Sequence, residues 1–269
     1  MTYTATFLLL FRKRLLFIVA FLFVTFQAYS QKQDTTSVPD LETDRPDQTE
    51  SASVVPRKSI QIEAGLYFQK DKAGATDIKY VAHPSALMRF GVLSWLELRA
   101  EGTYQTVTIE EESRKKLNGF GPLTVGAKAK LWDENGLRPQ TALMTMFDLP
   151  VGHNAFAPAN PEVNLRLLFK NSLSEKVDLS YNLAYGWEDG EAVKSYTVSL
   201  ATELSDKIGV FGEVFGDKTN GEKATHSFDA GFTVLVLPNL QVDLAAGTAI
   251  SSSSPEYFVT TGFSVRLPR

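Results

Sequence analysis

Acidic and basic side chains recur along most of the chain, within runs whose neighbouring residues are apolar. An ionised group is costly in an apolar environment unless it is paired or hydrated. Charges of both signs on one face can therefore do two things: form ion pairs, or line a path for polar solutes. The candidate lining residues are Glu63, Arg89, Glu97, Arg99, Arg166, Glu213, Asp229, Asp243 and Arg266.

A second group has the residue types of nucleophilic catalysis. His226, Ser227 and Asp229 could supply the base, nucleophile and acid of a hydrolase triad. In a strand, however, adjacent side chains point to opposite faces, so His226 and Ser227 cannot meet. The chain has no G-x-S-x-G motif, and His83 and His153 lack the spacing of metal ligands. We therefore expect no enzyme, no metal and no cofactor.

The candidate residues belong to segments with a period of two. From Val177 to Trp187 every odd-numbered position is large and apolar, and every even-numbered position is small or polar. A strand between lipid and water has this alternation, whereas a helix does not. The charged side chains of such strands must face the interior, because the opposite face lies in hydrocarbon.

About twelve such segments can be counted in the sequence. They span 58–70, 77–90, 94–108, 121–132, 138–150, 161–173, 176–187, 193–204, 207–217, 224–236, 239–249 and 256–268. Membrane strands need roughly 9–11 residues, whereas strands of globular proteins usually have about 5–6. The predicted fold is all-β: a transmembrane antiparallel β-barrel of about 12 strands over residues 58–269, with short periplasmic turns.

The connections between these segments alternate in length. Tight turns lie at 91–94, 174–175, 205–206 and 238, and longer connections at 71–76, 109–120, 151–160, 188–192, 218–223 and 250–255. Bacterial barrels have short periplasmic turns and longer external loops. We therefore expect the loops at 109–120 and 151–160 to face outward, and the turns at 174–175 and 205–206 to face the periplasm.

The N-terminus predicts export. A basic block, Arg12 to Arg14, precedes an apolar run from Leu15 to Phe26, and Ala28 and Ser30 are the small residues of a cleavage site. The run is too short for a hydrocarbon core of about 30 Å. We predict a signal peptide at 1–30, cleaved near Ser30. Residues 31–57 are polar with few large apolar side chains, and we expect them to lie against the barrel or within its mouth.

Composition excludes several classes of protein. The chain has no cysteine, which removes disulfides, thiolate catalysis and a lipoprotein anchor. The net charge is −4 and no basic stripe occurs, so we expect no nucleic acid as partner.

Several short segments resemble the outer-membrane β-barrel family named for the meta-pathway of phenol degradation. The matching segments are Thr43–Glu50, Gln61–Gly65, Arg89–Gly91, Glu97–Arg99, Leu149–Gly152, Asp229–Phe232, Gln241–Asp243 and Gly262–Arg266. Their order and spacing extend the resemblance from Glu42 to Arg269. The end of the chain departs from the terminal aromatic residue of many outer-membrane barrels.

The resemblance implies the outer membrane of a Gram-negative bacterium, with the assembly machinery and lipid of that membrane as partners. It also implies a transporter or porin-like channel for small solutes, hydrophobic or aromatic ones among them. A structural or sensory barrel with a filled lumen is the first alternative, and a barrel hydrolase the second. We hypothesise that the charged residues form one inward network that narrows the lumen. We expect Arg266 to join its acids, with Asp44 and Arg45 docking at its periplasmic end.

Overall fold

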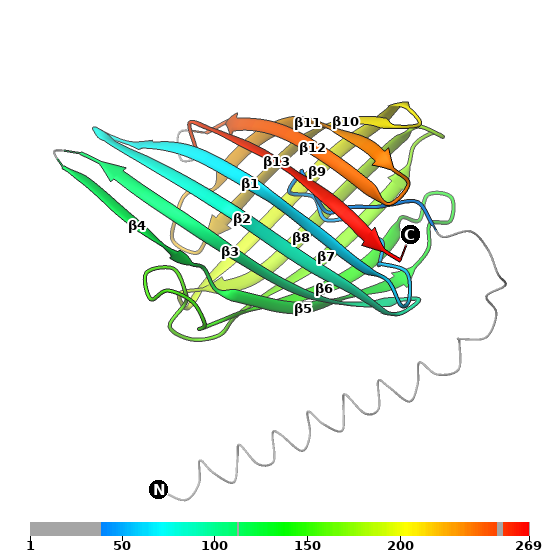
Figure 1. Cartoon of the computed structure of the whole chain (residues 1–269), viewed down its shortest axis with the longest axis horizontal. Coiled ribbons are helices and arrows are strands. Elements are labelled where there is room, and N and C mark those ends of the chain that lie inside the picture. The colour runs from blue at the N-terminus through cyan, green and yellow to red at the C-terminus, as the bar shows by residue number, and fades with distance from the viewer. Residues whose placement is uncertain (1–38, 112, 252–254, 269) are drawn as a thin grey trace, which may run out of the picture. The chain divides into compact units, whose positions relative to one another are not determined.

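The computed structural model describes residues 39–111, 113–251 and 255–268. The strands between Ile60 and Leu267 form one antiparallel sheet that closes on itself as a barrel (Figure 1). The closure runs through β1, which pairs with β2 on one side and with the last strand, β13, on the other. The predicted signal peptide lies outside the described residues.

The strands follow one another around the barrel in chain order. They are β1 (Ile60–Ala73), β2 (Thr76–Leu93), β3 (Leu96–Glu110), β4 (Arg114–Phe120), β5 (Leu123–Trp132), β6 (Gln140–Leu149), β7 (Glu162–Ser172), β8 (Val177–Glu188), β9 (Glu191–Ser205), β10 (Ile208–Thr219), β11 (Thr225–Leu237), β12 (Leu240–Ala249) and β13 (Tyr257–Leu267). No helix among the described residues is long and apolar enough to cross a membrane.

The thirteen strands occupy twelve positions in the barrel wall, because β4 and β5 share one position. Both pair with β3: β4 along residues 104–110 and β5 along residues 96–101. Between them lie Gly121 and Pro122, and proline has no N–H to continue the ladder. The predicted closed twelve-stranded barrel is therefore confirmed.

The expectation of a loop at 109–120 was wrong for most of this range. Residues 114–120 form β4, which continues the wall next to β3. The segment RKKLNGF lacks the alternation that marks the other strands, and nearly all of its residues are exposed. A strand reveals itself by period two only where one of its faces is apolar, so this polar extension gave no signal.

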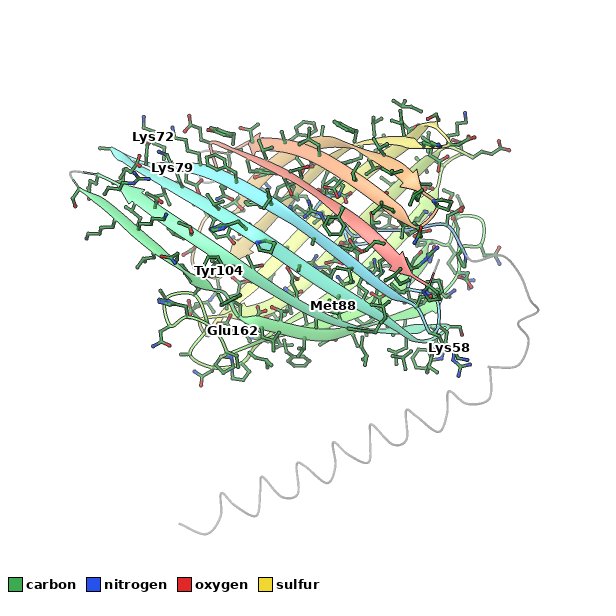
Figure 2. The ribbon with its side chains drawn as sticks, in the orientation of Figure 1. Lys58, Lys72, Lys79, Met88, Tyr104 and Glu162 are labelled. Carbon is green, nitrogen blue, oxygen red and sulfur yellow. The ribbon has the colours of Figure 1, made fainter. Side chains whose placement is uncertain are left out.

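Apolar side chains cover the outside of the barrel. Leu66, Leu98, Leu183 and Phe263 are among many large apolar residues that are about half exposed. Figure 2 shows Lys72 and Lys79 at one end of the wall, Lys58 at the other, and Met88 between them. An apolar band between two charged rims is the surface that a lipid bilayer requires.

The two faces of the wall make a prediction about stability. Leu183 is 56% exposed in the middle of β8. We expect Leu183→Arg to cost roughly 2–4 kcal/mol in refolding into lipid vesicles, since it places a charge near the bilayer midplane. Denaturant titration of the vesicle-bound protein measures this cost.

The matched control is Ser195→Arg on the neighbouring strand. Ser195 pairs across the sheet with Asp217, and Asp217 lines the lumen, so the new guanidinium has an acidic partner. Asn182, next to Leu183, is unsuitable as a control because it is buried against another segment of the chain. Equal losses at positions 183 and 195 would contradict a two-sided wall.

Candidate functional site

The interior of the barrel is crossed by the segment that precedes β1. We call residues Pro39–Pro56 the plug. Its backbone N–H groups donate to carboxylates on the wall: Asp44 N to Glu63 at 2.9 Å, Gln48 N to Glu213 at 2.7 Å, and Val55 N to Glu97 at 2.7 Å. Backbone donors that leave water must find partners, and here the strands supply charged ones. The plug is therefore held by the wall and needs no secondary structure of its own.

One side of the plug is anchored by a buried cluster of charges, centred on Asp44. Its carboxylate lies 2.7 Å from Arg99 Nη1, 3.1 Å from Arg89 Nη1 and 3.1 Å from Lys128 Nζ. These three cations come from β3, β2 and β5, and all are almost fully buried. Because a buried cation without a partner is very costly, the plug carboxylate completes this part of the wall.

Two wall carboxylates share the same cations. Glu63 lies 2.9 Å from Arg89, and Glu97 lies 3.0 Å from Arg89 and 3.1 Å from Arg99. We call the set Asp44, Glu63, Arg89, Glu97, Arg99 and Lys128 the ionic anchor. Burial by itself raises the pKa of Asp44, but the charges of Arg89, Lys128 and Arg99 outweigh burial and hold it well below its usual range. Asp44 therefore stays ionised at neutral pH.

Arg45 points to β12 and β13, which continue the wall from β1 on the side away from β2. Its Nη2 lies 2.9 Å from Asp243 Oδ1 and 3.0 Å from the Thr260 hydroxyl. The guanidinium occupies space left by Gly65 and Gly262, which face each other across β1 and β13. A Cβ at either glycine would lie within 2.7 Å of an Arg45 side-chain atom. These two glycines let the arginine lie flat against the wall.

The far side of the plug meets β8, β9 and β10. Asn182 accepts from Glu50 N at 2.8 Å and donates to Glu50 O at 3.1 Å. The Thr49 hydroxyl bonds Thr197 at 2.7 Å and also the Glu213 carboxylate. Further along, Ala52 packs with Ala142, Met144 and Leu168 in the small apolar core of the lumen.

Most of the predicted lining residues meet the plug, but they do not form one continuous network. Glu63, Arg89, Glu97 and Arg99 belong to the ionic anchor, whereas Asp243 pairs with Arg45. Glu213 and Asp229 lie on neighbouring strands on the other side of the lumen. Arg166 is at the edge of the anchor, 3.9 Å from Glu50.

The expected place of Arg266 in an acidic network was wrong. Its guanidinium donates to the main-chain oxygens of Asp40, at 3.0 Å, and Pro39. Asp243, which we had expected to share a network with Arg266, is taken by Arg45 instead. A sequence gives the strand of each residue, but not which cation on the plug reaches which acid on the wall.

Sequence reasoning did not select several residues of the site. They are Asp47, Glu50 and Asn182, which contact the plug–wall interface or belong to it. Lys128 was different, because its alternation with apolar residues had already placed its charge in the lumen. Asp47 and Glu50 lie in a polar segment without periodicity, where the sequence carried no signal for a buried role.

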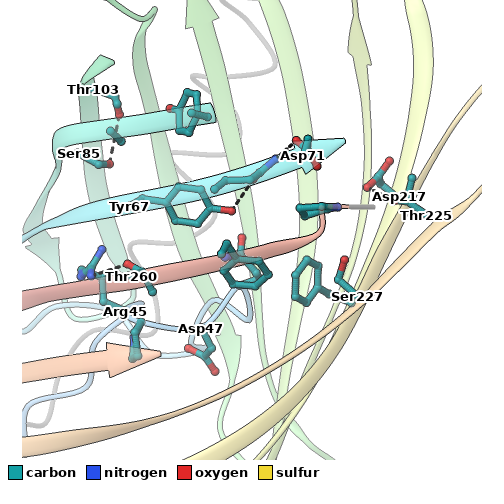
Figure 3. Close-up of a pocket in the computed structure, with 18 of the residues that line it drawn as sticks. Arg45, Asp47, Tyr67, Asp71, Ser85, Thr103, Asp217, Thr225, Ser227 and Thr260 are labelled. Carbon is teal, nitrogen blue, oxygen red and sulfur yellow. Dashed lines mark hydrogen bonds between the residues drawn. The ribbon is translucent and has the colours of Figure 1, made fainter. Parts of the chain in front are cut away.

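A cavity of about 1060 Å³ lies between the plug and the end of the β1–β2 hairpin. Figure 3 shows Arg45 and Asp47 of the plug beside this cavity, with Tyr67, Thr260 and Ser227 on its wall. Tyr67 stacks on Phe258 at 5.7 Å, and Phe258 meets Phe215 edge-on at 6.1 Å. The cavity is therefore walled by aromatic rings and polar groups together.

A second cavity of about 330 Å³ adjoins the first, since Glu50, Glu101 and Thr103 line both. Met144, Met146 and Pro122 give it an apolar side, and Asp148, Glu162 and Glu188 an acidic one. No group of three or more metal-ligating side chains among the described residues is placed to hold a metal ion.

The family model described as "Putative MetA-pathway of phenol degradation" matches residues 43–267. The chain belongs to this family. The match begins inside the plug, so the family includes the segment that fills the lumen as well as the strands. No curated protein sequence matches the chain.

Solved structures share the fold. An outer membrane channel from Pseudomonas putida F1 is similar with a TM-score of 0.59 and 14% identity, over 84% of this chain and 100% of that one. The translocator domain of the autotransporter NalP from Neisseria meningitidis has a TM-score of 0.54 and 12% identity, over 77% of this chain and 88% of that one. At these identities the likeness concerns the fold, which is that of outer-membrane barrels.

The Arg45–Asp243 pair allows a double-mutant test of plug docking. Asp243 is fully buried at its side chain and Arg45 is 17% exposed. We expect Arg45→Gln to cost about 3–5 kcal/mol, because it leaves a buried carboxylate without its cation. Asp243→Asn should cost less, and the double variant less than the sum of both, with a coupling of about 0.5–3 kcal/mol.

Denaturant unfolding of the refolded protein measures these costs. The control is Lys70→Gln, which removes partly exposed ion pairs with Glu256 and Asp77 and should change stability little. Strictly additive effects of the Arg45 and Asp243 substitutions would show that the two side chains do not interact in the folded protein.

Proposed function

We propose that this protein is a channel for small solutes in the outer membrane of a Gram-negative bacterium, held closed by its own plug. One observation carries the proposal. A cavity large enough for a small molecule runs down the lumen and ends on plug residues Asp44 to Glu50 rather than on the wall. A barrel that served only as a scaffold would not need so large a cavity beside a segment that is separate from its strands.

The lining of the cavity indicates the solute. Tyr67, Tyr80, Phe215 and Phe258 offer aromatic surface, and Asp71 and Asp217 offer acceptors. Such a lining suits a small solute with both a ring or apolar part and a polar group. The description of the family, which names phenol degradation, is in keeping with small aromatic solutes.

Localisation and partners follow from the same proposal. The apolar band of the wall places lipid around the barrel, and we infer export through the signal peptide at 1–30 and insertion by the outer-membrane assembly machinery. We also infer that the protein is not an enzyme. Ser227 lines the cavity, whereas His226 directly precedes it in β11 and therefore points to the opposite face of the wall, so the two cannot act as a Ser–His pair.

The alternative, a structural or sensory barrel, is favoured by the ionic anchor, which fills part of the lumen with charges. Planar-bilayer conductance separates the two functions. A variant lacking residues 39–50 removes Asp44 and Arg45 but keeps Val55 and its bond to Glu97. We expect a conductance well above that of the parent, together with faster entry of small antibiotics into cells.

A folded barrel is the condition for this comparison, and the shift in electrophoretic mobility on heating establishes it for both proteins. If the shortened barrel is folded and conducts no better than the parent, the plug is not the closure. If neither conducts at all, the sealed structural or sensory barrel is the correct reading.

A further inference from the structure

The plug is bonded differently on its two sides. Toward β2, β3 and β5, Asp44 of the plug meets three buried cations. Toward β10 and β11 the plug meets carboxylates instead: Asp47 faces Glu213 and Asp229. Among the described residues no lysine or arginine forms an ion pair with any of these three acids. We call Asp47, Glu213 and Asp229 the acid cluster.

The wall part of the acid cluster is buried. Glu213 and Asp229 are 1% and 0% exposed, and they stand directly opposite each other on β10 and β11. Among the described residues no donor reaches either carboxylate oxygen of Asp229, and the hydrogen bond open to it, with the facing Glu213 carboxylate, requires a bound proton. Two ionised carboxylates at facing positions repel each other, and burial adds the cost of desolvation. The arrangement is stable only if protons are bound to the cluster.

The plug is bound to these same acids. Glu213 accepts from Gln48 N at 2.7 Å and from the Thr49 hydroxyl, and Ser199 donates to Asp47. Burial raises the pKa of Asp47 well above its ordinary value, and the negative charges of Glu213 and Asp229 raise it further. Asp47 also lines the large cavity, so protons reach the cluster from that side.

We propose that Asp47, Glu213 and Asp229 form a proton-dependent latch that holds residues 47–49 against the β9–β11 wall, and that loss of the shared protons releases this side of the plug. The ionic anchor stays bound meanwhile and acts as the hinge. That the latch gates the lumen rests on the proposed channel function. That it holds residues 47–49 against the wall does not.

The direction of the pH dependence follows from linkage. Docking favours the protonated cluster, so the latch is strongest at low pH and weakens as pH rises through the raised pKa of Asp47. Asp44 has the opposite behaviour, because its docked pKa is lowered and its ion pairs are lost only in strong acid. Release at rising pH should therefore affect residues 47–49 and spare Asp44.

Other charged groups that face the cluster do not provide a counter-ion. Arg45 is engaged with Asp243 of β12, and Glu63 of β1 with Arg89. The phenol of Tyr67 on β1 bonds Gln69. Glu50, next along the plug, also has a raised pKa, since burial raises it to about 7 against the opposing effect of Arg99. A variant in the cluster itself is needed to separate Glu50 from the latch.

Hydrogen–deuterium exchange of the full-length refolded protein tests the proposal. The amide of Gln48 donates to Glu213, whereas those of Asp44 and Val55 donate to acids of the ionic anchor. Between about pH 5 and about pH 9, after correction for intrinsic exchange, we expect protection at Gln48 to fall by about tenfold or more. Protection at Asp44 and Val55 should remain unchanged and serves as the internal control.

The diagnostic variant is Asp229→Asn, which removes the charge and offers Glu213 a donor. In this variant Gln48 should stay protected across the whole pH range, whereas Asp206→Asn, in an exposed turn, should behave as the parent. The latch is wrong if parent protection at Gln48 does not change with pH, or if Asp229→Asn loses protection as the parent does. Simultaneous loss at Asp44 would also overturn it, because the plug would then leave as a whole.

Two further measurements complete the test. If millimolar Ca²⁺ restores protection at high pH and a chelator abolishes it, the cluster binds a cation and the proton latch is wrong. Bilayer conductance over the same pH range should rise in the parent and stay low in Asp229→Asn. A silent bilayer with the expected exchange pattern would reject the channel function and leave the latch intact.

Discussion

The buried contact between Asp44 and the cations Arg89, Arg99 and Lys128 is the interaction on which the interior depends. Three cations from β2, β3 and β5 are nearly fully buried at one level of the lumen, where wall acids Glu63 and Glu97 share them with the plug. Burial of unpaired cations would destabilise the barrel by several kcal/mol. The plug is therefore a structural component of the wall as well as an obstruction, and its removal has to expose these charges to water.

This dependence explains why a polar segment without secondary structure is ordered. Its backbone donors are bound by Glu63, Glu97 and Glu213, and its side chains by cations and hydroxyls of the strands. A free peptide of this composition could not bury enough apolar surface to fold. Within the barrel the partners are already fixed by the sheet, so the loss of conformational entropy is offset by charge-assisted hydrogen bonds.

The unequal bonding of the two sides connects structure with function. Ion pairs at the ionic anchor persist over a wide pH range, whereas the contacts of Glu213 and Asp229 exist without a cation. A plug bound equally on all sides would either stay or leave as a unit. A plug with one permanent and one conditional contact can move on a hinge, and the cavity beside Asp47 lies where such a movement would open the lumen.

The sequence by itself determined the barrel. Alternation as in Val177 to Trp187 places one face in lipid, and that pattern located every strand whose outer face is apolar; it missed only the polar strand β4. The same alternation assigned Glu63, Arg99 and Asp243 to the interior, because hydrocarbon excludes charge. Only the tertiary structure decided which charges meet. Arg45 reaches Asp243 through space left by Gly65 and Gly262, and Arg266 binds main-chain oxygens instead. Such pairings join residues far apart in the chain, and they depend on the path of a segment that has no periodicity of its own.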